Sequence, residues 1–210
     1  MDIVRNLTKR VMTRSIVHSK LSNREISRLP IKQWQAIRPK YWFKTGEYWD
    51  PEIRTKLLFE VKKVLDENMV NFWLSNGTAL GFLRDNDFIP WDDDIDIDVY
   101  SEDLLPVFDA LVEAFLNLDY VVRATERGRT SKMSVFKEGH KVSIGGLYLD
   151  GDQRVYAVCT IPAQYYETFI LYEYKGVKFR IPGPKEKYLS HLYFDWEVPN
   201  RNSDGHRFMN

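Results

Sequence analysis

The alternation of apolar and polar residues is sharpest near the middle of the chain, where aspartates stand at every second position. Ile95, Ile97 and Val99 fill the positions between them. Side chains two residues apart lie on the same face of a strand. The pattern therefore predicts a strand over 95–100 with one apolar face in a core and one face of carboxylates. The aspartates of this series are Asp92, Asp94, Asp96 and Asp98.

Other elements follow from the same reading of the pattern. Helical spacing predicts a basic amphipathic helix over 1–18, a helix from Pro51, one over 104–118 and a last one over 184–194. Ser22 and Glu25 have the spacing of a capping box, which predicts a short helix that Pro30 ends. Apolar runs predict strands over 70–74, 120–124, 131–137, 142–149 and 154–160, and a hairpin of 169–174 with 177–181 that turns at Lys175-Gly176. Because helices and strands do not alternate strictly, the expected class is α+β, a mixed β-sheet flanked by helices.

Composition narrows the function classes. The 210 residues contain 44% hydrophobic residues and are rich in aromatics, which argues against disorder. The single cysteine, Cys159, excludes an internal disulfide framework and a cysteine-based zinc cluster, so a reducing, cytoplasmic location is expected. No window approaches the about 18 apolar residues of a membrane span, and no signal peptide is visible.

The net charge of zero hides an asymmetry between the two ends of the chain. Residues 1–44 carry eleven Lys and Arg against two acidic residues. We therefore divide the chain into a basic helical N-terminal arm with an aromatic, irregular connector (1–50), a main domain (51–199) and a loose polar tail (200–210). The arm is either a helix docked on the domain, a frayed end, or a peripheral contact of residues 1–29 with the inner face of a membrane. Nucleic acid is not an expected partner, because the arm lacks interleaved aromatics and a reader motif.

Five aspartates between positions 92 and 98 repel one another unless a cation compensates them. Carboxylates two apart on a strand can converge on one Mg²⁺ or Mn²⁺. A solvated edge strand protected by charge is the structural alternative, although such edges favour Lys. A calcium loop of the EF-hand type is excluded, because Ile97 stands where that loop needs glycine and Asp103 where it needs glutamate.

A second feature, the turn Asn76-Gly77-Thr78, precedes a predicted helical turn. Glycine permits close approach, and backbone N–H groups at a helix start can hold a phosphate. A metal-binding strand combined with a phosphate-holding turn indicates phosphoryl or nucleotidyl transfer.

These residues resemble a known family. The stretches from Asn76 to Gly81, with Arg84, and from Phe88 to Ile97 (FIPWDDDIDI) are similar to the signature of LicD/fukutin-type proteins of the nucleotidyltransferase superfamily. The segment Tyr174–Pro199 resembles the closing segment of that family. The resemblance implies a minimal nucleotidyltransferase fold. It also implies a phosphotransferase that moves phosphocholine, ribitol phosphate or glycerol phosphate from a CDP-activated alcohol to a hydroxyl of a cell-surface or lipid-linked glycan.

Position by position, the resemblance makes Asp94 and Asp96 the catalytic metal-binding pair for Mg²⁺ or Mn²⁺. It assigns donor binding to Asn76, Gly77, Thr78 and Arg84. Asp92 and Asp98 are expected beside the metal pair or as polar residues of the core.

The third acidic residue of the family falls on Gly145. Either Asp150 or Glu138 replaces it, with Asp150 the candidate catalytic residue, or the acceptor site is altered, or catalysis is weak. Two alternative functions therefore stay open. One is a glycosyltransferase that uses its Asp-x-Asp with a nucleotide sugar, and the other is a binding or scaffold member of the family.

Overall fold

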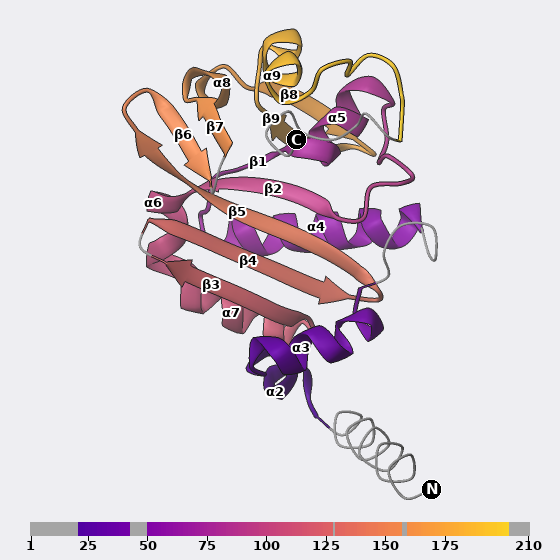
Figure 1. Cartoon of the computed structure of the whole chain (residues 1–210), viewed down its shortest axis with the longest axis vertical. Helices are drawn as coiled ribbons and strands as arrows, with labels where there is room; N and C mark the ends of the chain where they lie inside the picture. The colour runs from indigo at the N-terminus through magenta and orange to yellow at the C-terminus, as the bar shows by residue number, and fades with distance from the viewer. Residues whose placement is uncertain (1–20, 43–49, 128, 157–158, 202–210) are drawn as a thin grey trace, which may run out of the picture.

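The computed structural model describes residues 21–42, 50–127, 129–156 and 159–201. The predicted helix over 1–18 and most of the polar tail lie outside these residues. Within them the chain folds into helices around a mixed sheet, which confirms the predicted α+β class (Figure 1).

The helices are mostly short, and α4 is the longest. Their bounds are α2 (Asn23–Ser27), α3 (Ile31–Ile37), α4 (Pro51–Glu67), α5 (Asn76–Arg84), α6 (Ser101–Leu104), α7 (Phe108–Asn117), α8 (Gln164–Glu167) and α9 (Lys185–Leu192), with 3-10 turns at Arg38–Lys40 and Leu105–Val107.

The main sheet has the strand order β1-β2-β5-β4-β3, and β2 and β5 are its parallel pair. Its strands are β1 (Phe72–Leu74), β2 (Ile95–Tyr100), β3 (Val121–Arg127), β4 (Thr130–Lys137) and β5 (His140–Asp150). The end of β5 pairs with β6 (Gln153–Tyr156), which pairs with β7 (Cys159–Pro162). A separate hairpin joins β8 (Ile170–Tyr174) and β9 (Val177–Ile181).

Helices α4 and α7 cover one face of the main sheet (Figure 1). The aliphatic side chains of β2 join this core, where Ile95, Ile97 and Val99 are all at most 1% exposed. The opposite face is partly open, and there the strand directs its carboxylates. The period-two pattern of the sequence therefore becomes a core side and a polar side of one strand.

Two local predictions are confirmed in detail. Ser22 and Glu25 form a capping box at the start of α2. The β8–β9 hairpin turns at Lys175 and Gly176, which both have positive φ angles of 49° and 80°. A two-residue turn of this kind matches the twist of the flanking strands.

Three predicted elements differ from the structure. Residues 30–50 were expected to be irregular, but Ile31–Ile37 is a helix that buries Trp34 and Ile37. The helix over 104–118 is interrupted by a 3-10 turn that contains Pro106, because proline lacks the N–H that an α-helix needs. The strand over 154–160 is two antiparallel strands, β6 and β7.

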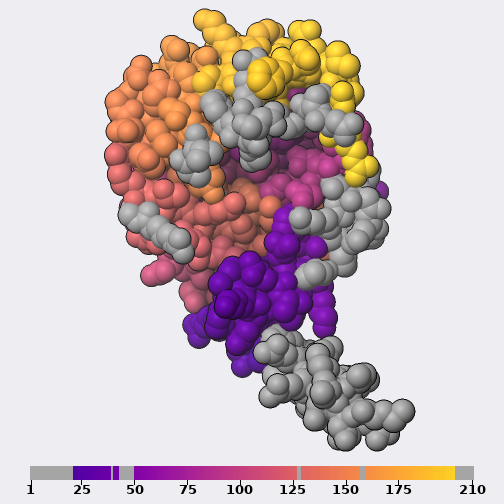
Figure 2. All heavy atoms as spheres, in the orientation of Figure 1, coloured from indigo at the N-terminus to yellow at the C-terminus, as the bar shows by residue number. Residues whose placement is uncertain are grey.

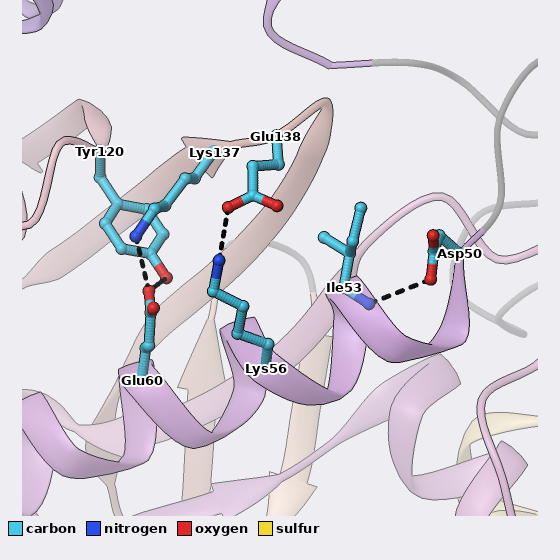
Figure 3. A network of polar contacts seen from close by, with 7 residues as sticks. All are labelled: Asp50, Ile53, Lys56, Glu60, Tyr120, Lys137 and Glu138. Carbon is cyan, nitrogen blue, oxygen red and sulfur yellow. Dashed lines mark hydrogen bonds and ion pairs between the residues drawn. The ribbon is translucent and has the colours of Figure 1, made fainter.

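A polar network fixes α4 to the edge of the sheet (Figure 3). The Glu60 carboxylate accepts hydrogen bonds of 2.8 Å from the Lys137 ammonium and the Tyr120 hydroxyl. One turn earlier, Lys56 pairs with Glu138 at 2.7 Å. Asp50 caps the helix by accepting from the N–H of Ile53 at 3.1 Å. Glu138 thus binds a lysine of the helical layer.

Replacing Glu60 with alanine is expected to lower the free energy of unfolding by about 1–3 kcal/mol, because the buried Tyr120 hydroxyl and the Lys137 ammonium lose their shared acceptor. Urea unfolding measures this. Lys56→Ala is the control: it removes an exposed ion pair from the same helix and should change the unfolding midpoint little. An equal loss of unfolding free energy in Glu60→Ala and Lys56→Ala would contradict the stabilising role of Glu60.

Candidate functional site

The aspartates of β2 and its preceding loop line one cavity of about 540 Å³ on the open face of the sheet. Asp92, Asp94, Asp96 and Asp98 all contribute to its wall, and so do Asn76 and Gly77. In Figure 2 this face is hollowed between the indigo N-terminal helices and the orange and yellow C-terminal elements. Asp94 and Asp96 therefore lie on the same side of the strand and beside the glycine turn.

Gly77 approaches the acidic loop so closely that no side chain fits between them. A Cβ at Gly77 would lie 2.9 Å from Cγ of Asp92 and would overlap its Oδ2. The preceding Asn76 has a φ of 46°, a left-handed conformation that asparagine tolerates well. The turn thus needs these residue types to bring the start of α5 against the carboxylates.

Backbone bonds connect the turn and the strand. The N–H of Ser75 donates to the carbonyl of Asp96 at 3.1 Å, and the N–H of Asp96 donates to the hydroxyl of Thr78 at 2.9 Å. Thr78 is 1% exposed and does not line the cavity, so its hydroxyl holds β2 in place. The Ser75 side chain makes no capping bond to α5. The N–H of Asn76 donates to the Tyr188 hydroxyl at 3.2 Å. The N–H groups of Gly77 and Thr78, next in this nine-residue helix, are the ones that an anionic ligand could reach.

Basic groups lie on the same cavity. The Lys141 ammonium is 2.6 Å from Oδ2 of Asp94, and the Ser143 hydroxyl donates to the same oxygen at 2.8 Å. Lys132 and Arg201 also line the cavity. The site therefore combines carboxylates for a cation with cations for phosphate oxygens.

Burial dominates the electrostatics of the aspartates. It raises the pKa of Asp92 to about 7, assisted by the charge of Asp94 and opposed by Arg54. Burial also holds the pKa of Asp96 well above its ordinary value, with Asp94 and Asp92 adding to the effect. The pKa of Asp98 is raised to about 6 by burial, although hydrogen bonds from Tyr166 and Ser75 lower it. A divalent cation would remove this penalty on the charged forms.

The raised pKa of Asp98 predicts a specific dependence of stability on pH. The folded state binds this proton more tightly than the unfolded chain, whose carboxyl has its ordinary pKa of 3.8. The contribution of Asp98 to the free energy of unfolding is thus fully present at low pH and is lost as the pH rises through about 6. The loss is at most about 3 kcal/mol. Urea unfolding in EDTA should show that the free energy of unfolding of Asp98→Asn rises relative to that of the native sequence between about pH 4 and pH 7. Parallel pH profiles would contradict this.

The donor set fits a divalent metal. One carboxylate oxygen from each of Asp92, Asp93 and Asp94 lies within 4.8 Å of the others, and hard oxygen donors suit Mg²⁺ and Mn²⁺. The Lys141 ammonium already places a positive charge on Asp94. Asp96 lines the same cavity beyond this triad. Asp92, Asp93 and Asp94 are therefore the residues whose oxygens lie close enough to hold one ion, and of the predicted pair Asp94 and Asp96 only Asp94 belongs to this group.

Besides Thr78, two predicted site residues lie outside the cavity. Arg84 is at the far end of α5, where it pairs with Asp85 at 2.8 Å and donates to the carbonyl of Trp196 at 3.3 Å. Asp150 ends β5 with a side chain 69% exposed, 3.7 Å from Arg129, and it is not among the residues that line the cavity. Gly145, at the position of the third acid, lies opposite Asp98 in the β2–β5 pair.

Sequence reasoning missed several residues at the site. Arg54 and Trp42 bind the backbone of the acidic loop, and Lys141 binds Asp94. Arg54 had a detectable signal, because it lies on the apolar stripe of α4 at helical spacing from Leu57, Leu58 and Val61. A charged residue on such a stripe implies a buried polar partner. Lys141 and Ser143 likewise occupy the polar positions of an alternating strand.

Within the described residues, every helix falls short of the length or the apolar character required to cross a bilayer.

Part of the chain is similar to known proteins. Residues 69–144 match the family model LicD/FKTN/FKRP, nucleotidyltransferase domain. Human ribitol 5-phosphate transferase FKRP is 37% identical over 70 residues, which are 31% of this chain and 14% of that protein. The uncharacterized protein RP689 of Rickettsia prowazekii (strain Madrid E) is 27% identical over 153 residues, 68% of this chain and 54% of its own length. The chain thus spans between about a seventh and about half of the length of these relatives.

Among solved structures, the solution structure of the antibiotic-resistance factor ANT(2'')-Ia superimposes with a TM-score of 0.47 at 16% identity, over 71% of this chain and 76% of that one. A crystal structure of ANT(2'')-Ia with adenylyl-2''-tobramycin gives a TM-score of 0.46 at 17% identity, over 69% and 77%.

The matched range contains the glycine turn and the whole acidic strand, so the resemblance that the sequence suggested is confirmed where the site is built. Residues 69–144, about a third of the chain, thus match the nucleotidyltransferase domain of the LicD/FKTN/FKRP family.

Proposed function

We propose that this protein is a metal-dependent transferase. It moves a phospho-alcohol of the phosphocholine, ribitol phosphate or glycerol phosphate type from a CDP-activated donor to a hydroxyl of a cell-surface or lipid-linked glycan. The observation that carries the proposal is the shared cavity, in which the clustered aspartates, the start of α5 and Lys141 face one ligand space. The name of the human relative supports a ribitol phosphate among these groups.

Each group of residues has a role that follows from its chemistry. A divalent ion on Asp92, Asp93 and Asp94 would supply charge neutralisation for the donor diphosphate. The N–H groups of Gly77 and Thr78 in the first turn of α5 bind phosphate oxygens, because glycine permits their close approach. The Lys141 ammonium, which pairs with Asp94, also lines the cavity and interacts there with the negative charge of the donor phosphates. Positioning and charge neutralisation supply most of the catalysis in such a transfer.

Gly145 bears on the scaffold alternative. A β-carbon there would lie 3.5 Å from Oδ1 of Asp98 and 3.7 Å from the Tyr156 ring, which is ordinary contact. The position therefore has space, and Asp98 and Tyr156 already line this part of the cavity. Buried like-charged carboxylates are costly to keep without a cation, and this favours the enzyme over a scaffold.

A thermal-shift panel tests the proposal. CDP-choline, CDP-ribitol and CDP-glycerol are each added with Mg²⁺, and UDP-glucose with Mg²⁺ is the comparison. We expect at least one CDP-alcohol to raise Tm by several degrees through preferential binding to the folded state. Stabilisation by the UDP-sugar alone would favour the glycosyltransferase. Nucleotide binding without any CMP release in the presence of glycan acceptors would favour the scaffold.

Peripheral membrane contact through residues 1–29 and a cytoplasmic location stay predictions. Residues 1–20 lie outside the described residues, whereas α2 packs on β3, where Arg123 donates to the carbonyls of Ser27 and Leu29. Co-sedimentation with anionic liposomes should fall when residues 1–20 are deleted from the chain. Unchanged co-sedimentation would contradict the membrane contact.

A further inference from the structure

The acidic loop Asp92–Asp94 has three consecutive carbonyl groups held by side chains from earlier in the chain. The carbonyl of Asp92 accepts from one terminal nitrogen of Arg54 at 3.0 Å, and that of Asp94 accepts from the other. Between them, the carbonyl of Asp93 accepts from Nε1 of Trp42 at 2.8 Å. The loop precedes β2, so the strand ladder does not fix it. Side-chain donors therefore fix the backbone that carries the clustered carboxylates.

Trp42 makes a second contact at the same place. The ammonium of Lys141 lies 4.1 Å from the centre of the Trp42 ring, within the range of a cation–π interaction. The same ammonium neutralises Asp94 at 2.6 Å. The edge of the indole thus binds the loop backbone, and its face binds the cation that balances one of the metal-binding carboxylates.

A separate small core determines where Trp42 lies. Ile26, Trp34 and Ile37 of the N-terminal segment pack with Val121 of β3 and Phe136 of β4. Trp42 packs at the border of this cluster, 6.3 Å from the Phe136 ring centre to centre. In Figure 1, α2 and α3 lie at the end of the sheet near β3. Burial of this apolar cluster therefore brings Trp42 to the acidic loop.

We propose that Trp42 is a positioning residue of the metal site, and that the segment 21–42 is consequently required for full metal affinity. This inference rests on the metal site of the proposed function. Residues 42 and 54 precede the family-matched range 69–144, so the matched segment alone lacks the donors that shape its acidic loop. Trp42 acts through the loop backbone and through Lys141, which holds Oδ2 of Asp94.

The test compares Mn²⁺ affinity in full-length variants, measured from the EPR signal of free Mn²⁺. Trp42→Phe keeps an aromatic ring but removes the N–H donor and should raise the Kd for Mn²⁺ by about tenfold, as expected for a group that orients metal ligands. Trp34→Phe is the matched control. It changes a more deeply buried indole of the same cluster, 4% exposed, that makes no described bond to the acidic loop, and should keep the Kd within about twofold.

A double-mutant cycle covers the case in which Trp42→Phe destabilises the fold. Trp42→Leu removes the ring face as well as the N–H donor. If Trp42 acts partly through Lys141, the effect of Trp42→Leu on Kd should be smaller by about threefold in a Lys141→Met background, because one of its two contacts is already lost there. A merely structural role leaves the effect unchanged in that background.

Each outcome has one meaning. The inference is supported by a tenfold loss of Mn²⁺ affinity in Trp42→Phe, an unchanged affinity in Trp34→Phe, and a smaller effect of Trp42→Leu in the Lys141→Met background. If the native protein binds Mn²⁺ and Trp42→Phe binds it equally well, the inference is overturned and the proposed function stands. The same holds if both tryptophan variants lose Mn²⁺ affinity to the same extent. Native protein that binds no Mn²⁺ overturns the metal site itself, and the inference with it.

Discussion

The double substitution Asp94→Asn with Asp96→Asn is expected to abolish transfer of the phospho-alcohol. It should also abolish the thermal stabilisation by Mg²⁺ and a CDP-alcohol. The two side chains line the cavity that holds the other aspartates and the glycine turn. Amides are weaker ligands for a hard cation than carboxylates and carry no charge to balance it. Loss of several kcal/mol of charge stabilisation corresponds to a fall in rate of about 10³-fold or more. CMP release and the shift in Tm measure the two effects.

Stability in EDTA separates a lost site from a lost fold. Asp96→Asn alone removes a carboxyl whose pKa is held well above its ordinary value by burial and by Asp94 and Asp92. The metal-free variant should therefore be at least as stable as the native chain near neutral pH. Asp109→Asn, an exposed acid on α7, is the control for a change of one charge. A double variant that still transfers, or an Asp109 variant that does not, would refute the assignment.

Gly77→Ala is expected to weaken donor binding by about tenfold or more and to destabilise the protein. The new Cβ would overlap the Asp92 carboxylate, whose loop is held from behind by Arg54. Alanine is ordinarily a better helix former than glycine by about 1 kcal/mol. Overpacking costs about 1–3 kcal/mol, so the clash decides the sign. Isothermal titration with a CDP-alcohol and Mg²⁺ measures binding, and urea unfolding measures stability.

Gly145→Ala is the matched comparison for stability, because it adds the same methyl group to the same cavity wall without overlap. It should be as stable as the native chain or slightly more stable, since glycine weakens a strand. Equal destabilisation at Gly77 and Gly145 would show that the contact with Asp92 is not the cause.

The carboxylate strand was predictable because a period of two fixes the faces of a strand whatever its partners are. The sequence therefore predicted β2 with its bounds, its aliphatic core side and the common face of Asp94 and Asp96. The capping box at Ser22 and the turn at Lys175-Gly176 were predictable for the same reason: each depends only on neighbours within a few residues.

The positions of Arg84 and Asp150 were not predictable from a motif. Arg84 is seven residues beyond Gly77 on α5, which places it about 10 Å along the helix axis from the turn. It is used there to bind Asp85 and the carbonyl of Trp196. Asp150 lies where β5 has left the parallel pair with β2 and pairs with β6 instead. Both outcomes depend on lengths and registers that no local pattern encodes.

The sequence by itself determined the likeness of residues 69–144 to LicD-type proteins, the α+β class, the acidic strand and the glycine turn, since these depend on residue type and short-range spacing. The tertiary structure alone decided what surrounds the aspartates. It brought Trp42, Arg54 and Lys141 to them from 51, 38 and 47 residues away. It also separated Thr78, which braces β2, from Asn76 and Gly77, which line the cavity. The physical reason is that burial of the two apolar clusters fixes the packing of α4 and of segment 21–42 on the sheet, and only that packing determines which polar groups meet.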